Sequence, residues 1–360
     1  MRRQPSTSRS WTAAGALLIS LLTLVAISGC IAEDIEDIRD ILFPGDGESS
    51  GRSPDLALSG LTIQPREPEP GQAITISVVV GNRGRRESQE SAISLSVGEG
   101  EITRAQLPPI SGGGTYELTF EDQVVLPAGL NVLRLLADPD DLITEVYEGD
   151  NALGATVLVG EPAYRRIFKW DYGGIDWELD LSLPATDIES LNPDRSLYSY
   201  DDYLEYVTPD DRTADAVAHI LDFYSRSEDM GSYDEVSFLL AFVQEMPYTK
   251  DEDTKGDDYS RYPIETLNDR GGDCEDTSLL MASITSNPRH FNYGTALIII
   301  DDHMAVGVTG SEGIGGVYFS PADRPDRRYY YCETTGKGYA IGEMPEIYDG
   351  ADLKELIQCP

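Results

Sequence analysis

The stretch GGDCEDTSLL at residues 271–280 decides the fold of the C-terminal half of this 360-residue chain. Its two glycines allow a tight turn, Asp273 is a favourable helix N-cap, and Asp276 is a short capping-box partner three residues later. We therefore expect a helix to begin here, with Cys274 in its first turn. Unpaired N–H groups and the helix dipole favour a thiolate at that position. The adjacent Glu275 and Asp276 raise the thiol pKa, so a cationic partner is needed.

Helix and strand patterns surround this stretch in a definite order. Apolar residues recur at helical spacing in residues 213–224 and 233–246, before Pro247. After residue 294 we expect four strands, at residues 295–300, 303–308, 317–320 and 329–333. Helices followed by an antiparallel sheet are typical of an α+β papain-like domain, which we place at residues 210–360.

His303 and Glu333 are the predicted partners of the thiol. In the strand that starts at His303, this residue shares a face with Ala305, whose small side chain leaves room for a helix N-terminus to dock. A third group must orient the imidazole and favour its charged form, and strand alternation places Glu333 on the face opposite Cys332. We therefore predict a catalytic triad of Cys274, His303 and Glu333.

The order cysteine, histidine, acid, with a glycine-rich helix start, resembles the transglutaminase-like superfamily, and more closely its extracytoplasmic members from archaea. The resemblance is carried by residues 242–251, 262–267, 271–280, 303–308, 332–335 and 341–345. It implies a cysteine enzyme that acts on amide bonds through a thioester. By the same resemblance, the amide of Gln244 would join the Cys274 N–H in an oxyanion hole. Many members of the superfamily have Asp where this chain has Glu333.

The predicted chemistry acts on a protein or peptide substrate. The Cys274 thiolate attacks an amide carbonyl, and His303 protonates the departing amine. The thioester then passes to water, as in a peptidase or amidase, or to a second amine, as in a transglutaminase. We favour hydrolysis, because the sequence identifies no acceptor-amine site, and no cofactor is expected. The alternative is a non-catalytic adhesion or scaffold protein, which the acidic residues beside Cys274 favour.

Residues 54–160 have a different pattern, with short alternating runs such as 74–78 and 93–97 between Gly, Pro and Asn clusters. About seven such runs predict an all-β immunoglobulin-like sandwich. The segment resembles the CARDB (cell-adhesion-related) domain, through motifs such as PDL at 54–56, EPG at 69–71, VGNRG at 80–84 and EGDN at 148–151. The resemblance implies a spacer or adhesion module without an active site.

Residues 161–209 are rich in aromatic side chains and lack a regular period, so we expect an irregular connecting segment. Its rings, among them Trp170, Trp177 and Tyr198, are expected to pack on the outer face of the next domain. An aromatic surface that binds a polymer is the alternative.

The N-terminus has the layout of a secretory signal. A basic leader precedes an apolar run at residues 13–27, which ends in small residues before Cys30 and resembles a lipobox. We expect residues 1–29 to be a signal peptide, Cys30 to be lipidated and residues 30–53 to be a tether. An uncleaved signal anchor is the alternative. Both place the chain outside the cytoplasm, attached to the cell membrane.

The acidic composition excludes some functions. The chain has 64 acidic and 27 basic residues and a formal net charge of −37, so its surface repels nucleic acid. Only five of the basic residues are Lys, which suits a halophilic protein. The acidic runs 138–141, 251–253 and 257–258 offer calcium ligands but lack EF-hand spacing, so we expect solvated surface. His219 and His290 are expected to be structural, and no metal site is predicted.

Two cysteines, Cys332 and Cys359, have no part in this chemistry. The chain is expected outside the cytoplasm, where disulfides form. They are therefore candidates for a disulfide that holds the C-terminal tail, with two free thiols as the alternative.

Overall fold

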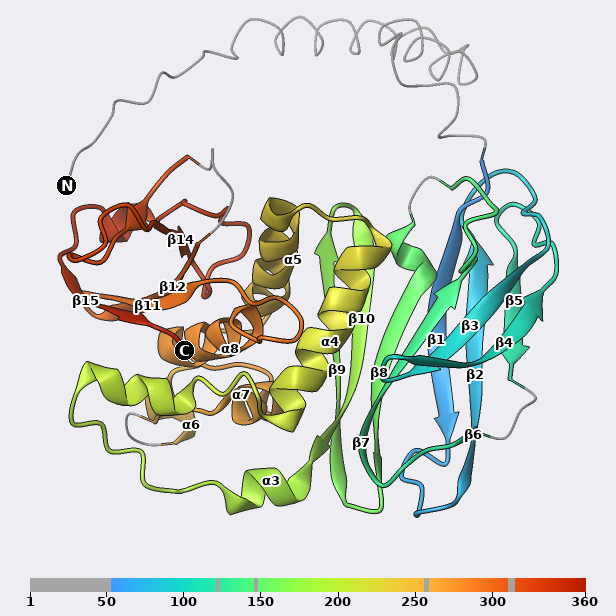
Figure 1. Ribbon diagram of the computed structural model, residues 1–360, viewed down its shortest axis with the longest axis horizontal. Coiled ribbons are helices and arrows are strands. Elements are labelled where there is room, and N and C mark those ends of the chain that lie inside the picture. Colours follow the sequence, from blue (N-terminus) through green and yellow to red (C-terminus); the bar gives the residue numbers. More distant parts are fainter. Residues whose placement is uncertain (1–52, 121–123, 146–147, 256–258, 310–314) are drawn as a thin grey trace, which may run out of the picture. The chain divides into compact units, whose positions relative to one another are not determined.

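Figure 1 shows the computed structural model of the chain, which describes residues 53–120, 124–145, 148–255, 259–309 and 315–360. The predicted signal peptide, Cys30 and the tether lie outside the described residues. Contacts group Arg52–Pro360 into one unit. Within the described part, no helix is both long and apolar enough to cross a membrane.

The N-terminal half is a two-sheet sandwich, as predicted. The first sheet has the order β1-β2-β5, with β6 also paired to β2; its strands are Leu56–Gln64 (β1), Ala73–Asn82 (β2), Thr115–Thr119 (β5) and Val124–Val125 (β6). The second sheet starts with Gly100–Leu107 (β4), Ser91–Val97 (β3), Gly129–Ala137 (β7) and Ala152–Val159 (β8). Buried aliphatic side chains from both sheets, such as Ile76, Leu95 and Leu135, form one core.

The second sheet continues beyond the sandwich. Strand β10 (Ile175–Pro184) pairs parallel to β8, and β9 (Ala163–Tyr172) pairs antiparallel to β10. The full order is β4-β3-β7-β8-β10-β9. The prediction of an irregular segment at residues 161–209 is therefore wrong for its first half, which is a β-hairpin.

The hairpin could have been predicted from its YGGI turn. Gly173 and Gly174 have φ angles of +67° and +81°, which a two-residue type I′ turn requires. Trp170 and Trp177 lie opposite each other on the two strands and are 4% and 3% exposed. Both belong to the core of the C-terminal half, whereas the prediction placed them on its outer face, and Tyr198 is 90% exposed.

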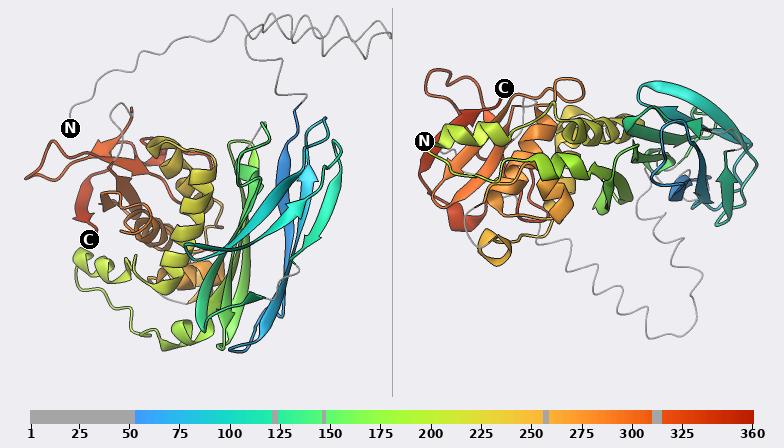
Figure 2. Two further views of the ribbon diagram at one scale, coloured as in Figure 1. Left: turned by 45° about the vertical axis from the view of Figure 1, so that its right-hand side comes forward. Right: turned by 90° about the horizontal axis from the view of Figure 1, so that it is seen from below.

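Helices follow the hairpin, and their bounds are Ala185–Ser190 (α3), Tyr200–Tyr206 (η2, a 3-10 helix), Arg212–Ser227 (α4), Ser232–Gln244 (α5), Asp251–Thr254 (α6), Pro263–Asp269 (α7) and Cys274–Thr285 (α8). Helix α4 begins where Asp211 accepts hydrogen bonds from the N–H groups of Thr213 and Ala214. It packs against β7 and β8, and Figure 2 shows it beside the green strands. The predicted helices α4, α5 and α8 are confirmed, whereas α6 and α7 were not predicted.

The last sheet has five antiparallel strands in the order β13-β14-β12-β11-β15. Their bounds are Thr295–Ile300 (β11), His303–Val308 (β12), Tyr318–Phe319 (β13), Tyr329–Cys332 (β14) and Leu353–Gln358 (β15). The predictions for β11 and β12 agree to the residue. Strand β15 was missed because it lies at the sheet edge and is mostly exposed, so it lacks an apolar run. A short 3-10 helix, Glu346–Tyr348 (η3), precedes it.

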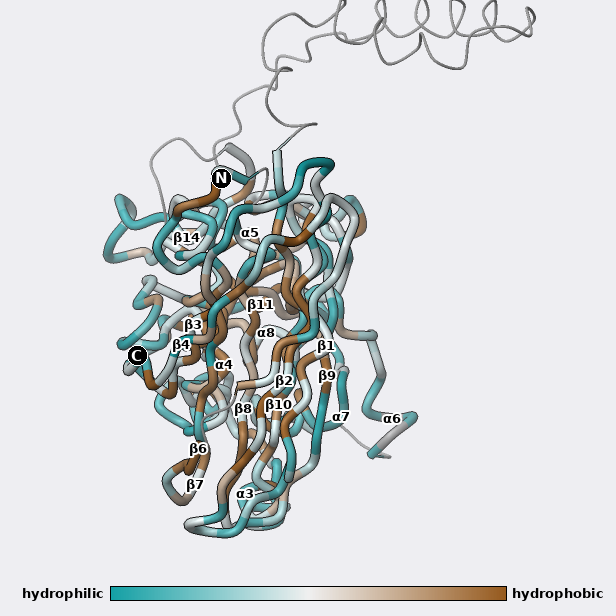
Figure 3. Tube along the Cα trace, turned by 90° about the vertical axis from the view of Figure 1, so that its right-hand side faces the viewer, coloured by the Kyte–Doolittle hydropathy of each residue, from teal (hydrophilic) through white to brown (hydrophobic). Residues whose placement is uncertain are grey.

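Tyr224 joins α4 to the long sheet. Its buried hydroxyl accepts a hydrogen bond from the Gly154 N–H and donates one to the Glu178 carbonyl, both at 2.6 Å. These contacts bridge β8 and β10, whose register covers only two residue pairs. Figure 3 shows hydrophobic stretches along β2, β8 and β10, in line with the fully buried pattern of β8. The sandwich and the helical region therefore share one sheet.

Candidate functional site

Helix α8 begins at Cys274, as predicted, with Asp273 as its extended N-cap residue. Asp276 accepts a hydrogen bond from the Asp273 N–H at 3.3 Å, which is the expected return contact. Gly272 is needed for this approach, because a Cβ there would lie 2.4 Å from the Asp276 Oδ2. The turn thus fixes a partly exposed cysteine at the start of a helix.

Arg261 compensates the buried charge of Asp276. The two side chains are 1% and 0% exposed and form an ion pair. The Arg261 backbone N–H also donates to Asp276 Oδ1 at 2.7 Å, and its guanidinium pairs with Asp251 at 2.5 Å. Burial raises the pKa of Asp276 to about 7, and Arg261 opposes this shift. Of the two acids that follow Cys274, Glu275 is therefore the one that acts on the thiol.

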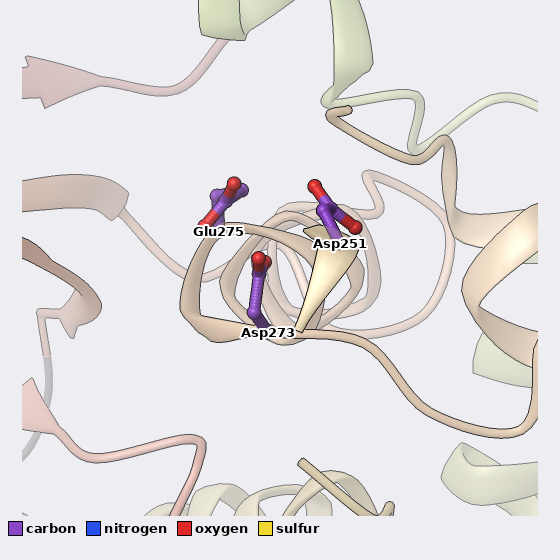
Figure 4. Close-up of side chains that lie close together, drawn as sticks. All are labelled: Asp251, Asp273 and Glu275. Carbon is purple, nitrogen blue, oxygen red and sulfur yellow. The ribbon is translucent and has the colours of Figure 1, made fainter. Parts of the chain in front are cut away.

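Figure 4 shows Asp251, Asp273 and Glu275, whose carboxylate oxygens lie within 4.8 Å of one another. Asp251 is only 4% exposed, so the prediction of solvated surface at residues 251–253 is wrong for this residue. Burial raises the pKa of Asp273 to about 9, with a further contribution from its hydrogen bond to Glu275. Burial also raises the pKa of Glu275. Burial therefore makes it unfavourable for these two neighbouring carboxyl groups to be ionised together.

These surroundings hold Cys274 as a neutral thiol. Burial raises the pKa of Cys274 and the charge of Glu275 raises it further, while the Met304 backbone N–H acts in the opposite direction. The Cys274 Sγ donates a hydrogen bond to Glu275 Oε2 at 3.3 Å. The favourable effect of the helix start is thus outweighed in this arrangement.

His303 and Glu333 form the predicted buried pair. Their Nε2 and Oε2 atoms lie 3.1 Å apart, and the side chains are 3% and 1% exposed. Tyr331 donates its hydroxyl to Glu333 Oε2 at 2.7 Å, and Thr335 donates its hydroxyl to Oε1 at 2.6 Å. Burial raises the pKa of Glu333, but the bonds from His303 and Thr335 outweigh it and lower this pKa to about 2. Glu333 is therefore a fixed carboxylate that orients the imidazole.

Tyr348 covers the imidazole, a contact that the sequence analysis missed. Its ring stacks on His303 with centroids 4.2 Å apart and an interplanar angle of 9°. Burial raises the pKa of the Tyr348 hydroxyl, and the charge of Glu333 raises it further. Nothing in the local sequence points to this role, because η3 approaches β12 only in the folded chain.

The predicted triad is only partly assembled. In the described part of the chain, no hydrogen bond joins Cys274 to His303. Helix α8 packs on the sheet face that carries Met304, whereas Ala305 belongs to the cluster on the opposite face. The prediction that the helix docks beside Ala305 is therefore wrong, since the apolar side chains of the other face attract it. The sulfur reaches the start of β12 next to the Met304 N–H, and Nδ1 is the imidazole nitrogen that does not bind Glu333.

Gln244 has a structural role that differs from the predicted one. Its Nε2 donates to the carbonyls of Glu333 and Tyr339 at 2.8 and 3.0 Å, and its Oε1 accepts from the Gly338 N–H at 3.0 Å. An amide has two donor hydrogens, and both are used here. The prediction that Gln244 contributes to an oxyanion hole is therefore wrong. The side chain instead fixes the loop that follows Glu333.

Cys332 and Cys359 are free cysteines, so the predicted disulfide is wrong. Cys332 ends β14 and Cys359 follows β15, and these strands are separated by β12 and β11. Three strand spacings amount to about 14 Å, beyond the roughly 7 Å that a disulfide allows between Cα atoms. Burial raises the pKa of each thiol to about 12.

His219 and His290 lie together in space, with ring centroids 4.7 Å apart in a stacked geometry. His290 contacts Asp222 and Asp215 at 3.3 and 3.7 Å. The sequence did not indicate that these two histidines lie together, because they are far apart along the chain. The side chains of His219 and His290 are 10% and 7% exposed, which supports the structural role predicted for both.

The two sheets of the N-terminal half define an immunoglobulin-like sandwich of the kind found in cell-surface proteins. Residues 53–155 match the CARDB family model, so this part of the chain is a CARDB domain, as predicted. Similar solved structures include a Pyrococcus furiosus CARDB domain in complex with di-metal ions; it is 16% identical and has a TM-score of 0.28, with 31% of this chain and 93% of that chain covered.

Two further solved structures are similar over the same share of the chain. A domain from Methanosarcina acetivorans is 21% identical, with a TM-score of 0.27, and covers 30% of this chain and 92% of that one. A Listeria innocua β-glucosidase in complex with glucose is 12% identical, with a TM-score of 0.23, and covers 30% of this chain and 16% of the enzyme. A comparison with curated proteins found no match.

Proposed function

We propose that the chain is a surface-anchored cysteine acyl-transfer enzyme of the transglutaminase-like kind, attached through Cys30 or an uncleaved signal anchor. Cys274 is the nucleophile, His303 the acid and base, and Glu333 the residue that orients the imidazole. The observation that carries this proposal is the buried contact of 3.1 Å between His303 and Glu333 at the strand end that α8 and Cys274 reach. The CARDB domain supports a location at the cell surface.

The reaction begins when Cys274 loses its proton to the free Nδ1 of His303. The thiolate attacks the amide carbonyl of a peptide, and the oxyanion accepts a hydrogen bond from the unpaired Cys274 N–H at the helix start. The imidazolium then protonates the departing amine, and a thioester remains on the sulfur. A water molecule then gives a proton to the imidazole and attacks the thioester, which releases the acid product and the Cys274 thiolate; the thiolate takes the proton back from the imidazolium. Attack by an amine in place of water is the second outcome.

Amine or ammonia release tests this function. The full chain is incubated with casein-derived and cell-wall peptides at neutral pH and in molar salt, where a halophilic protein is expected to be stable. We expect release by the wild type and none by Cys274→Ala, while Cys359→Ala, which removes a thiol at the opposite end of the sheet beside Thr295, retains activity. Equal release by wild type and Cys274→Ala would contradict the assignment.

A non-catalytic scaffold is the second candidate function, because one observation favours it. Burial and the adjacent Glu275 raise the pKa of Cys274 well above its ordinary value. An inert thiol of this kind would react with iodoacetamide more slowly than a free cysteine at the same pH.

A further inference from the structure

A cavity of about 470 Å³ lies beside the outermost strand of the long sheet. Residues 167–170 of β9 form one part of its lining, and Phe242, Met246 and Pro247 at the end of α5 form another. Successive side chains of a strand point to opposite faces of the sheet. A cavity that touches four successive residues therefore runs along the edge of β9 and not over one face.

The hairpin turn determines which backbone groups face this edge. Tyr172 and Ile175 flank the two-residue turn, so they exchange hydrogen bonds as a pair, and every second residue does the same. Phe168 therefore bonds to β10, whereas Ile167 and Lys169 direct their N–H and C=O groups away from it. Strand β9 ends the sheet order, so no described strand pairs with this side.

The cavity lining combines apolar walls with unmet polar groups. Trp170 lines it, is 4% exposed, and its indole N–H has no acceptor among the described residues. Lys169 and Glu245 each have an oppositely charged partner at 2.7 Å. Arg270 is exposed and forms no ion pair with the described residues, so the cavity carries one uncompensated positive charge on a chain of net charge −37.

The cavity wall continues to the predicted nucleophile. The Pro247 carbonyl accepts a hydrogen bond from the Gly272 N–H at 3.4 Å, and Tyr248 forms a parallel bridge with Gly272. Cys274 follows two residues later, at most about 7 Å along the chain. One end of a peptide bound along β9 would therefore lie near the start of α8.

We propose that this edge binds an extended acidic peptide, which adds as a further strand to β9. The peptide exchanges hydrogen bonds with Ile167 and Lys169, places an apolar side chain in the cavity and sets a carboxylate against Arg270. The role of this peptide as acyl donor rests on the proposed function. Binding of the peptide at β9 does not, because it does not need the thiol.

Fluorescence anisotropy of the full-length Cys274→Ala chain tests binding apart from chemistry. The probe is a fluorescein-labelled hexapeptide of β-branched residues with one aspartate, and its counterparts carry lysine in place of aspartate or N-methylated amides. We expect saturable binding of the acidic probe and at least about tenfold weaker binding of both counterparts. The absence of binding up to millimolar protein would overturn the proposal.

Two variants locate the binding. Ile167→Pro removes an outward N–H without breaking the β10 ladder and should weaken binding at least about tenfold. Arg270→Asn suits the left-handed backbone at φ +60° and should abolish the preference for aspartate over lysine. Lys354→Asn, which removes a positive charge from the distant β15, should change neither result. If Ile167→Pro binds the peptide as tightly as the parent chain does, the proposed strand pairing is wrong, whether or not the wild type has amidase activity. If the peptide binds at β9 but the wild type has no amidase activity, the binding site stands and only the role of the peptide as acyl donor is wrong.

Discussion

Neutralising the carboxylate beside the thiol should activate Cys274. In Glu275→Gln the charge that lies 3.3 Å from the sulfur is lost. Coulomb's law assigns this charge about 1 kcal/mol at a dielectric constant of 80 and about 5 kcal/mol at 20. Because 1.36 kcal/mol corresponds to one pKa unit, the thiol pKa should fall by roughly 1 to 4 units. Asp273 also raises the pKa of Cys274 and remains in the variant, so this pKa stays above its ordinary value.

The assay is the rate of alkylation of Cys274 by iodoacetamide as a function of pH, followed by mass mapping of the peptide that contains it. The wild type should react slowly up to alkaline pH, and the rate profile of Glu275→Gln should move to lower pH. Glu117→Gln, which neutralises an exposed carboxylate of the sandwich, is the matched control and should leave the profile unchanged. An unchanged profile in a folded Glu275→Gln protein would refute the electrostatic reasoning.

Three further predictions concern stability and thiol state. Tyr224→Phe should lower the free energy of unfolding, measured in urea, by about 1–3 kcal/mol, because the Gly154 N–H loses its acceptor in the core. The control Tyr233→Phe, at an exposed site, should change this free energy by under about 0.5 kcal/mol. Equal effects of the two substitutions would contradict the bridging role of Tyr224. The pKa of Glu333 is about 2 in the folded chain against an ordinary 4.5, so the ionised carboxylate stabilises the fold above pH 4.5 and this stabilisation is lost as the pH falls toward 2. The melting temperature of a Glu333→Gln chain should therefore fall less steeply than that of the wild type as the pH is lowered from 4.5 to 2. An equally steep fall in both proteins would argue against the ion pair. Non-reducing mass mapping should find Cys332 and Cys359 as free thiols, and a linked peptide pair would disprove the strand order.

Local patterns predicted much of the fold and of the site. The helix start at Cys274 follows from its glycines and capping residues, and the bounds of β12 follow from strand alternation. The same alternation placed Glu333 where it meets His303. These features depend on a few neighbouring residues, so a single sequence contains them.

Features that depend on distant segments could not be predicted in this way. Trp170 and Trp177 suggested an irregular aromatic segment, although they belong to strands that join the sandwich sheet. Arg261 contacts Asp276 15 residues later, and Tyr348 stacks on His303, and no local pattern predicts either contact. Gln244 had the right position for an amide near the site, but its hydrogen-bond partners are determined by the loop after Glu333.

The most direct test of the central claim is acylation of the thiol. The full chain is mixed briefly with an activated acyl ester at neutral pH, stopped with acid and analysed by peptide mass mapping. An acyl adduct on Cys274 in the wild type, formed at least about a hundredfold more slowly in His303→Ala, is the predicted result. An adduct that forms equally fast without the imidazole, or none on Cys274, would contradict the assignment of this site as catalytic.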